Sequence, residues 1–159
     1  MIYAAWALLL GMLTLFFEGR LARQYNPNIA LQASNSSDAP SQVTLKRNRF
    51  GHYVTSGTIN GQIVTFLVDT GATRISIPGN VARKLGLKRG IPHRVMTANG
   101  SITVYSTFLE RVALGPLEMR NLQGHVNPHM GGQEVLLGMN FLKNLEMIQR
   151  ANRLTLKEL

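Results

Sequence analysis

The sequence predicts an all-β domain that follows an apolar N-terminal helix, and three observations carry this prediction. From Val43 onward, stretches rich in apolar and β-branched residues alternate with turn residues about every 8–12 positions, a spacing typical of all-β folds. Asn-Gly pairs, which favour tight hairpins, stand between such stretches at 60–61 and 99–100. Residues 1–17 contain no charged side chain. The chain of 159 residues is long enough for one modest core.

The predicted strands and helices follow from turn residues and hydrophobic pattern. A short helix is predicted over 80–85, with Asn80 as its N-cap and Gly86 as its stop, and a second short helix follows Gly138. No internal repeat is present, which argues against a second lobe. The predicted strands are 52–59, 62–68, 74–77, 93–98, 101–114, 117–126, 146–150 and 153–156, the last two completing the sheet.

Residues 1–17 are apolar on every face, which disfavours a helix buried in a soluble core. At 1.5 Å per residue, this run is near the lower limit for crossing a hydrocarbon core of ~30 Å. A cleaved signal peptide is the alternative, but the run has no basic region before it and no pair of small residues marking a cleavage site after it. We therefore expect an uncleaved transmembrane anchor over 1–23, with residues 2–17 in contact with the membrane.

A flexible linker is predicted over 24–42, before a domain that covers 43–159. The linker contains Asn26-Pro27 and a polar stretch over 35–41, a composition typical of turns and disorder. We expect it to tether the domain to the anchor without becoming ordered itself.

The formal net charge of +9 lies in the predicted domain, because the two basic and two acidic residues before position 43 cancel. Such a field favours anionic partners, either lipid headgroups beside the anchor or acidic substrate segments. The basic residues occur as scattered pairs without interleaved aromatic residues or a recognised nucleic-acid-binding module. We expect no nucleic-acid partner.

Histidine spacing gives no support for a metal site. His125 and His129 are four residues apart, a spacing that suits zinc only on a helix, and Asn127-Pro128 between them would break one. His52 and His93 are isolated in the sequence, and the chain has no cysteine. We expect neither a metal nor another cofactor.

Asp69 is the only aspartate after residue 38, and an apolar stretch over 64–68 leads directly into it. The residues Thr70-Gly71-Ala72 follow. On its own, an aspartate here is consistent with an ordinary turn or capping residue at the end of a strand. Gly71 suits a position where the backbone approaches a ligand closely or takes a positive φ. About 65 residues later, a second apolar strand ends in Leu136-Leu137-Gly138 and leads into a helical pattern.

Together, these two motifs resemble those of the retropepsin-like aspartic proteases, the single-lobe relatives of pepsin, over roughly residues 50–159. The resemblance implies a single-lobe β-barrel with one or two short helices, in which Asp69 is the catalytic residue. It also implies an active-site loop, a glycine motif that passes behind this loop, and a hairpin flap that covers the substrate. These three segments would contain, respectively, Thr70, Gly71 and Ala72; Leu136, Leu137 and Gly138; and Ala98, Asn99 and Gly100.

An aspartic protease needs two carboxylates that share one proton, because two like charges ~3 Å apart cannot both ionise. This chain supplies one from such a loop, so the resemblance implies a homodimer that hydrolyses peptide bonds of protein substrates. In the family the threonine hydroxyl, here that of Thr70, reaches the partner's loop, and the subunits pair largely through their termini. The alternatives are a peptide-binding module that does not cleave, and a latent monomer that dimerisation activates.

The two arguments about membrane orientation disagree. Arg20 and Arg23 after the apolar run place the domain in the cytoplasm by the positive-inside rule. The resemblance to bacterial single-span proteins instead implies the inner membrane with the protease domain in the periplasm, and this is the orientation that we expect.

Overall fold

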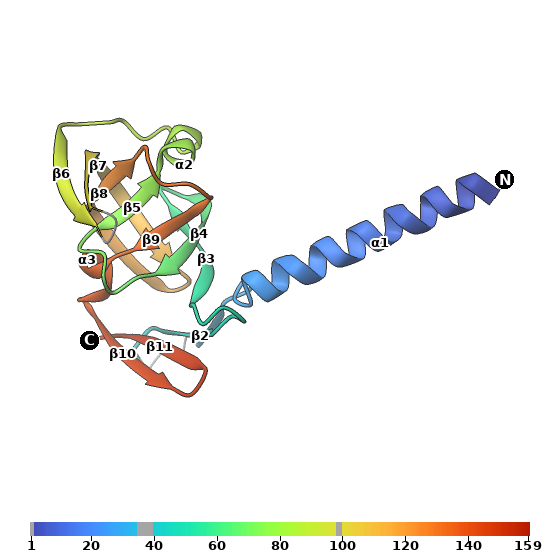
Figure 1. Ribbon diagram of the computed structural model, residues 1–159. Coiled ribbons are helices and arrows are strands. Elements are labelled where there is room, and N and C mark those ends of the chain that lie inside the picture. The colour runs from blue at the N-terminus through green and yellow to red at the C-terminus, as the bar shows by residue number, and fades with distance from the viewer. Residues whose placement is uncertain (1, 35–39, 98–99) are drawn as a thin grey trace.

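A computed structural model describes residues 2–34, 40–97 and 100–159 of the chain (Figure 1). A long helix leads away from a small β-rich body, into which two short helices are built. The helices are α1 (Ile2–Tyr25), α2 (Gly79–Lys84) and α3 (Met139–Leu142). The strands are β1 (Gln32–Ser34), β2 (Gln42–Lys46), β3 (Val54–Ile59), β4 (Gln62–Val68), β5 (Ile75–Pro78), β6 (Pro92–Thr97), β7 (Gly100–Leu114), β8 (Leu117–Asn127), β9 (Glu134–Leu137), β10 (Leu145–Arg150) and β11 (Arg153–Glu158).

The main body is a six-stranded barrel, which confirms the predicted all-β, single-lobe architecture. Its strands follow the order β3-β4-β9-β5-β8-β7, and a further pairing of β3 with β7 closes the ring. Strand β6 lies outside the ring and pairs with β7. Apolar side chains on alternate strand positions point inward, as expected where one face of each strand is buried. The fully buried ones include Ile59, Phe66, Ile75, Val126 and Leu137.

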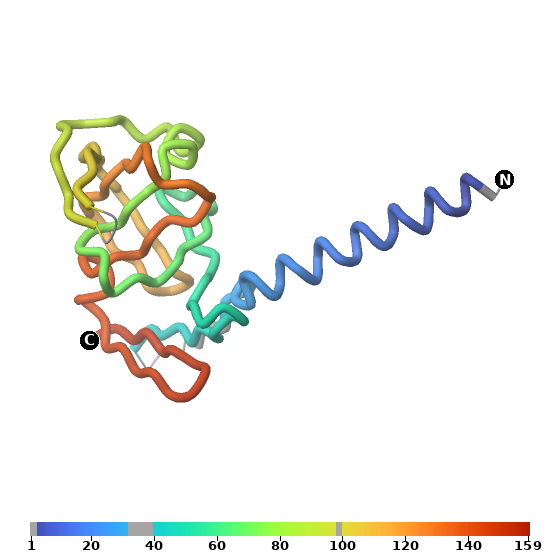
Figure 2. The backbone as a smooth tube through the Cα atoms, viewed as in Figure 1, coloured from blue at the N-terminus to red at the C-terminus, as the bar shows by residue number. Residues whose placement is uncertain are grey.

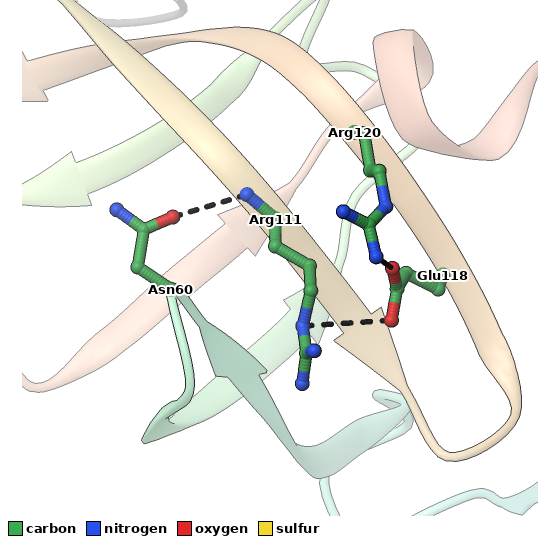
Figure 3. Close-up of polar contacts among 4 residues, drawn as sticks. All are labelled: Asn60, Arg111, Glu118 and Arg120. Atoms are coloured by element: carbon green, nitrogen blue, oxygen red, sulfur yellow. Dashed lines mark hydrogen bonds and ion pairs between the residues drawn. The ribbon is translucent and has the colours of Figure 1, made fainter.

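The closure of the barrel depends on the first Asn-Gly hairpin. Asn60 and Gly61 both take positive φ (50° and 80°), as a tight two-residue hairpin requires. The Asn60 N–H donates to the Arg111 carbonyl (2.8 Å), and the Arg111 N–H donates to Asn60 Oδ1 (3.1 Å). Figure 3 shows that Glu118 then lies between Arg111 and Arg120, with N–O distances of 3.4 and 2.7 Å. The turn of the β3–β4 hairpin is thus fastened to the β7–β8 hairpin.

A second sheet, with the order β1-β2-β11-β10, lies at one end of the barrel. The sequence predicted that the last two strands complete the main sheet, and this was wrong: they pair with each other and with β2. The reason is hydrophobic burial, since Val43 and Leu45 on β2 and Leu154 and Leu156 on β11 join the core cluster of the barrel. The first two strands in the sequence, β1 and β2, and the last two, β10 and β11, therefore form one sheet within a single chain.

The described part of the predicted linker is packed against both sheets. Asn28 is 6% exposed, and its side-chain amide donates to the carbonyls of Val54 (2.7 Å) and Lys46 (2.9 Å). Its Oδ1 accepts the Lys46 N–H (2.7 Å). Asn26 donates to Ser56 Oγ (3.2 Å). Asn28 thus satisfies backbone groups of β2 and the Val54 carbonyl of β3, and Asn26 bonds a side chain of β3, so a composition typical of disorder here belongs to an ordered segment.

Helix α2 begins one residue earlier than the sequence predicts. Pro78 occupies the N-cap position and the helix starts at Gly79, while Asn80 lies in the first turn with its Oδ1 accepting the Val81 N–H (2.9 Å). Strand β5 runs directly into the helix, so no separate capping residue is inserted. Gly86 ends the helix with φ of 66°, which confirms its predicted role.

Helix α1 extends beyond the apolar run to Tyr25. By length and composition, residues Tyr3–Tyr25 are long and apolar enough to cross a membrane: an 18-residue window in this stretch has a mean hydropathy of 1.4, and none of that window is buried against the protein.

We predict that Asn28→Ala lowers the free energy of unfolding by about 2–3 kcal/mol, because it leaves buried backbone groups of β2 and β3 without partners. Gln149→Ala, at an exposed position on β10, is the control and should change stability by less than ~0.5 kcal/mol. Chemical denaturation of the full-length chain in detergent measures both values. Equal stability of the two variants would show that the segment before β2 is an unattached linker.

Candidate active site

Asp69 lies where two parallel strands end side by side. Strand β4 pairs with β9 in parallel, with Val68 opposite Leu137, and the Asp69 N–H donates to the Leu137 carbonyl (3.2 Å). On the other side of β4, the Val68 N–H donates to the Tyr53 carbonyl (3.0 Å). The backbone of this half-buried aspartate is therefore fixed from two neighbouring segments.

The side chain of Asp69 shapes the loop that follows it. Its Oδ1 accepts the Gly71 N–H (2.9 Å), and its carbonyl accepts the Ala72 N–H (3.3 Å), a local turn of the kind that aspartate favours. Thr70 and Gly71 remain exposed at the tip. Gly71 does not take a positive φ; it is close to the carboxylate instead, since an added Cβ would lie 3.2 Å from Asp69 Oδ1.

Gly138 lies directly behind this loop. A Cβ at this position would be 2.5 Å from the Arg74 carbonyl oxygen and 2.7 Å from that of Ala72, so only glycine fits. The first N–H groups of α3 then reach the loop: Met139 donates to the Ala72 carbonyl (2.7 Å) and Asn140 to the Thr73 carbonyl (3.0 Å). The N–H groups at the start of a helix lack acceptors within the helix, and here carbonyl groups of the loop serve as these acceptors.

Asn140 is a positioning residue that the sequence analysis missed. Its Oδ1 accepts the Ile75 N–H (3.0 Å), and its Nδ2 donates to the Gln123 carbonyl (2.7 Å). It thereby ties the end of the loop and the start of β5 to β8. A polar residue inside the apolar stretch 135–142 was the signal that could have identified it.

The hairpin β6–β7 is the predicted flap. Its strands pair from Pro92 opposite Tyr105 to Thr97 opposite Gly100, and Gly100 has φ of 104°. Of the predicted tip residues, Ala98 and Asn99 lie outside the described residues. Met96 near the tip is 82% exposed, so this hairpin presents an apolar side chain to solvent.

Two histidines that are isolated in the sequence meet in the structure. His93 on β6 and His125 on β8 place their Nε2 atoms 2.9 Å apart, and Arg74 Nη1 is 3.3 Å from the same nitrogen of His125. Because arginine can only donate, His125 Nε2 acts as an acceptor and His93 as a donor. Burial, followed by the charges of His93 and Arg74, lowers the pKa of His125 to about 4. This cluster connects the end of the Asp69 loop to the β6–β7 hairpin.

Comparisons with known proteins agree with this geometry. The family described as gag-polyprotein putative aspartyl protease matches residues 55–144, which include the Asp69 loop, the β6–β7 hairpin and Gly138. An uncharacterized protein encoded in the region 5′ of cobV in Sinorhizobium sp is 35% identical over 77% of this chain. An uncharacterized protein of Rickettsia prowazekii is 31% identical over 66% of it. The chain spans about half the length of these two relatives, 54% and 46% respectively.

A solved structure shares the fold. The crystal structure of a retropepsin-like aspartic protease from Rickettsia conorii superposes with a TM-score of 0.64 and 28% identity, covering 81% of this chain and 94% of that one. This superposition covers a larger share of the chain than residues 55–144, which the family matches. The shared fold therefore includes elements outside that range.

We predict that Gly138→Ala destabilises the chain by about 1–3 kcal/mol or more, because the added methyl group meets the backbone of the Asp69 loop. Gly131→Ala is the matched control, since a Cβ there has no neighbour within 4 Å. Thermal unfolding measures both variants. A Gly138→Ala chain as stable as the control would show that the loop does not rest on this glycine.

The lowered pKa of His125 gives a prediction for pH dependence. A histidine whose folded-state pKa is below its ordinary value of 6.5 binds protons more weakly in the folded than in the unfolded chain. Stability is therefore lost as the pH falls from about 6.5 to about 4. Over this pH range, the free energy of unfolding should depend less steeply on pH in His125→Asn than in the parent chain. His52→Asn, at an exposed position, should behave like the parent.

Proposed function

This chain belongs to the gag-polyprotein putative aspartyl protease family, the retropepsin-like aspartic proteases, and we propose that it is a membrane-anchored endopeptidase. In this proposal two identical chains each contribute Asp69 to one active site. The observation that carries the proposal is the loop 69–74, which is held against Gly138 and the start of α3 by backbone contacts.

The surroundings of Asp69 support a site shared between chains. The hydrogen bonds that Asp69 makes with the described residues all involve backbone groups, so no carboxylate within ranges 2–34, 40–97 and 100–159 is hydrogen-bonded to it. Thr70 and Gly71 at the loop tip are exposed and free to meet another copy of the loop. A two-fold axis between two such loops would bring both aspartates together, as an isologous dimer requires.

In the dimer, the two Asp69 carboxylates hold one water molecule and one shared proton between them. The ionised carboxylate removes a proton from the water, whose oxygen attacks the carbonyl carbon of the peptide bond. The protonated carboxyl group donates to the carbonyl oxygen, and collapse of the tetrahedral intermediate with protonation of the nitrogen releases the two products. The flap hairpin covers the extended substrate and excludes other water.

The terminal sheet constrains how such a dimer assembles. Strands β1, β2, β10 and β11 already pair within one chain, so two chains do not need to exchange terminal strands to complete this sheet. We propose that the subunits meet through the loop tips and adjoining surface, with α1 of both chains in one membrane. Shared anchoring raises the effective concentration of the two domains.

We predict that Asp69→Asn abolishes cleavage of a diverse peptide library by the full-length chain in detergent, and that excess Asp69→Asn chain suppresses the parent through mixed dimers. EDTA should have no effect. Gln149→Ala, an exposed change on β10 and outside the loop, is the control variant and should retain cleavage. Activity from a demonstrated monomer would contradict the shared site, and peptide binding without cleavage would show a binding module instead.

For the location, we propose the bacterial inner membrane with the protease domain in the periplasm. The intact chain should then stay with membranes after carbonate extraction and retain its N-terminal residues. Protease added to spheroplasts should degrade the domain. A soluble product that begins after α1 would reveal a signal peptide, and protection of the domain would place it in the cytoplasm.

A further inference from the structure

The loop Arg47–Gly51 is fastened to the last turn of α1. Asn48 is 8% exposed, and its Nδ2 donates to the Tyr25 carbonyl (3.0 Å) at the end of the helix. Its Oδ1 accepts the N–H groups of Phe50 (3.0 Å) and His52 (2.9 Å), which fixes the shape of the loop. Figure 2 shows the backbone of this loop beside the end of α1. The loop therefore has a defined position relative to the helix.

The exposed side of the loop combines arginine with aromatic rings. Arg49 donates to Gln24 Oε1 (2.9 Å), and its guanidinium carbon is 4.8 Å from the centre of the Phe50 ring. The Phe50 ring is 55% exposed and has its centre 6.3 Å from that of Tyr25. A shallow hollow of about 220 Å³ between helix and loop is lined by Leu21, Gln24, Tyr25, Arg49 and Phe50.

The arginines of this region carry charge that the described residues do not neutralise. No ion pair within the described ranges involves Arg20, Arg23, Arg47 or Arg49. A second hollow, of about 450 Å³, runs along the helix and is lined by Phe16, Gly19, Arg20, Arg23 and Gln24. We define the juxtamembrane patch as Arg20, Arg23, Tyr25, Arg47, Arg49 and Phe50.

The length of α1 places this patch at a particular depth if the helix spans a membrane. At 1.5 Å per residue, the ~30 Å of hydrocarbon is crossed in about 20 residues. Counted from Tyr3, this distance ends near Arg23, so Tyr25 and the attached loop would lie among the headgroups. Arg20 lies one turn inside this boundary, and its long side chain can extend its guanidinium group to the same depth. Tyrosine and other amphipathic aromatic residues favour that depth, and juxtamembrane arginines attract anionic lipids.

We propose that the juxtamembrane patch docks on the surface of an anionic bilayer, with its arginines against lipid phosphate groups and the Phe50 ring at the boundary of the acyl chains. This inference rests on the proposed membrane anchor. Positive charge, exposed aromatic surface and continuity with the apolar helix together favour a bilayer over a protein partner. The protease domain is then held in one orientation on the membrane instead of swinging on a tether.

The single tryptophan of the chain, Trp6, makes a direct test possible. The double variant Trp6→Phe/Phe50→Trp of the full-length chain is reconstituted in vesicles that contain lipids brominated near the headgroup. We expect blue-shifted emission and strong quenching in vesicles with phosphatidylglycerol, and less of both in phosphatidylcholine alone. Adding Arg47→Gln and Arg49→Gln should remove the difference between the two lipids.

The matched control is Trp6→Phe/Ile63→Trp, since Ile63 is 82% exposed and lies beside α2, away from the patch. Its emission should be unquenched in both lipids. All variants are checked for unchanged melting temperature and for retention after carbonate extraction. Loss of the chain on extraction would overturn both the anchor and the docking.

Three other results would overturn the docking alone. In the first, the chain stays in the membrane after carbonate extraction but the tryptophan at position 50 is not quenched. In the second, this tryptophan is quenched equally in both lipids, whether or not Arg47 and Arg49 are present. Shielding of that tryptophan only when a protein substrate is added would assign the patch to a protein partner, and would also overturn the proposal.

Discussion

The contact between Gly138 and the backbone of loop 69–74 is the constraint on which the rest of the site depends. Two polypeptide segments cross at a distance that leaves no room for a Cβ, and the crossing allows Met139 and Asn140 to donate to carbonyls of the loop. A loop held in this way needs no ligand to take its shape. The position of the Asp69 carboxylate is therefore a property of the folded barrel.

The topology of the barrel explains why this crossing occurs. Strand β9 lies between β4 and β5, so the chain that connects β4 to β5 must pass over the end of β9. Asp69 stands at the start of that connection and Ile75 at its end, where Asn140 receives the Ile75 N–H. The site is thus built where a connection crosses a strand, and both motifs in the sequence mark that place.

The sequence predicts these local features well because each depends on neighbouring residues. Asn60-Gly61 specifies its own hairpin, and the approach of an apolar strand to Asp69 is visible without the fold. Contacts between distant segments are different: the His93–His125 pair, the role of Asn140 and the packing of Asn28 link residues that no local pattern connects. The terminal strands were placed in the wrong sheet for the same reason. The alternation of apolar and polar residues predicts a strand and which of its faces is buried, but not the strand with which it pairs.

The central claim is that two chains bring their Asp69 loops together, and cross-linking at the loop tip tests it most directly. The chain has no cysteine, so Thr70→Cys introduces a unique thiol, and Ile63→Cys provides an exposed control at the opposite end of β4 from the loop. In proteoliposomes, a short thiol-specific cross-linker should join Thr70→Cys chains into a covalent dimer and leave Ile63→Cys chains single. Cross-linking of Thr70→Cys no greater than that of the control would contradict the shared active site.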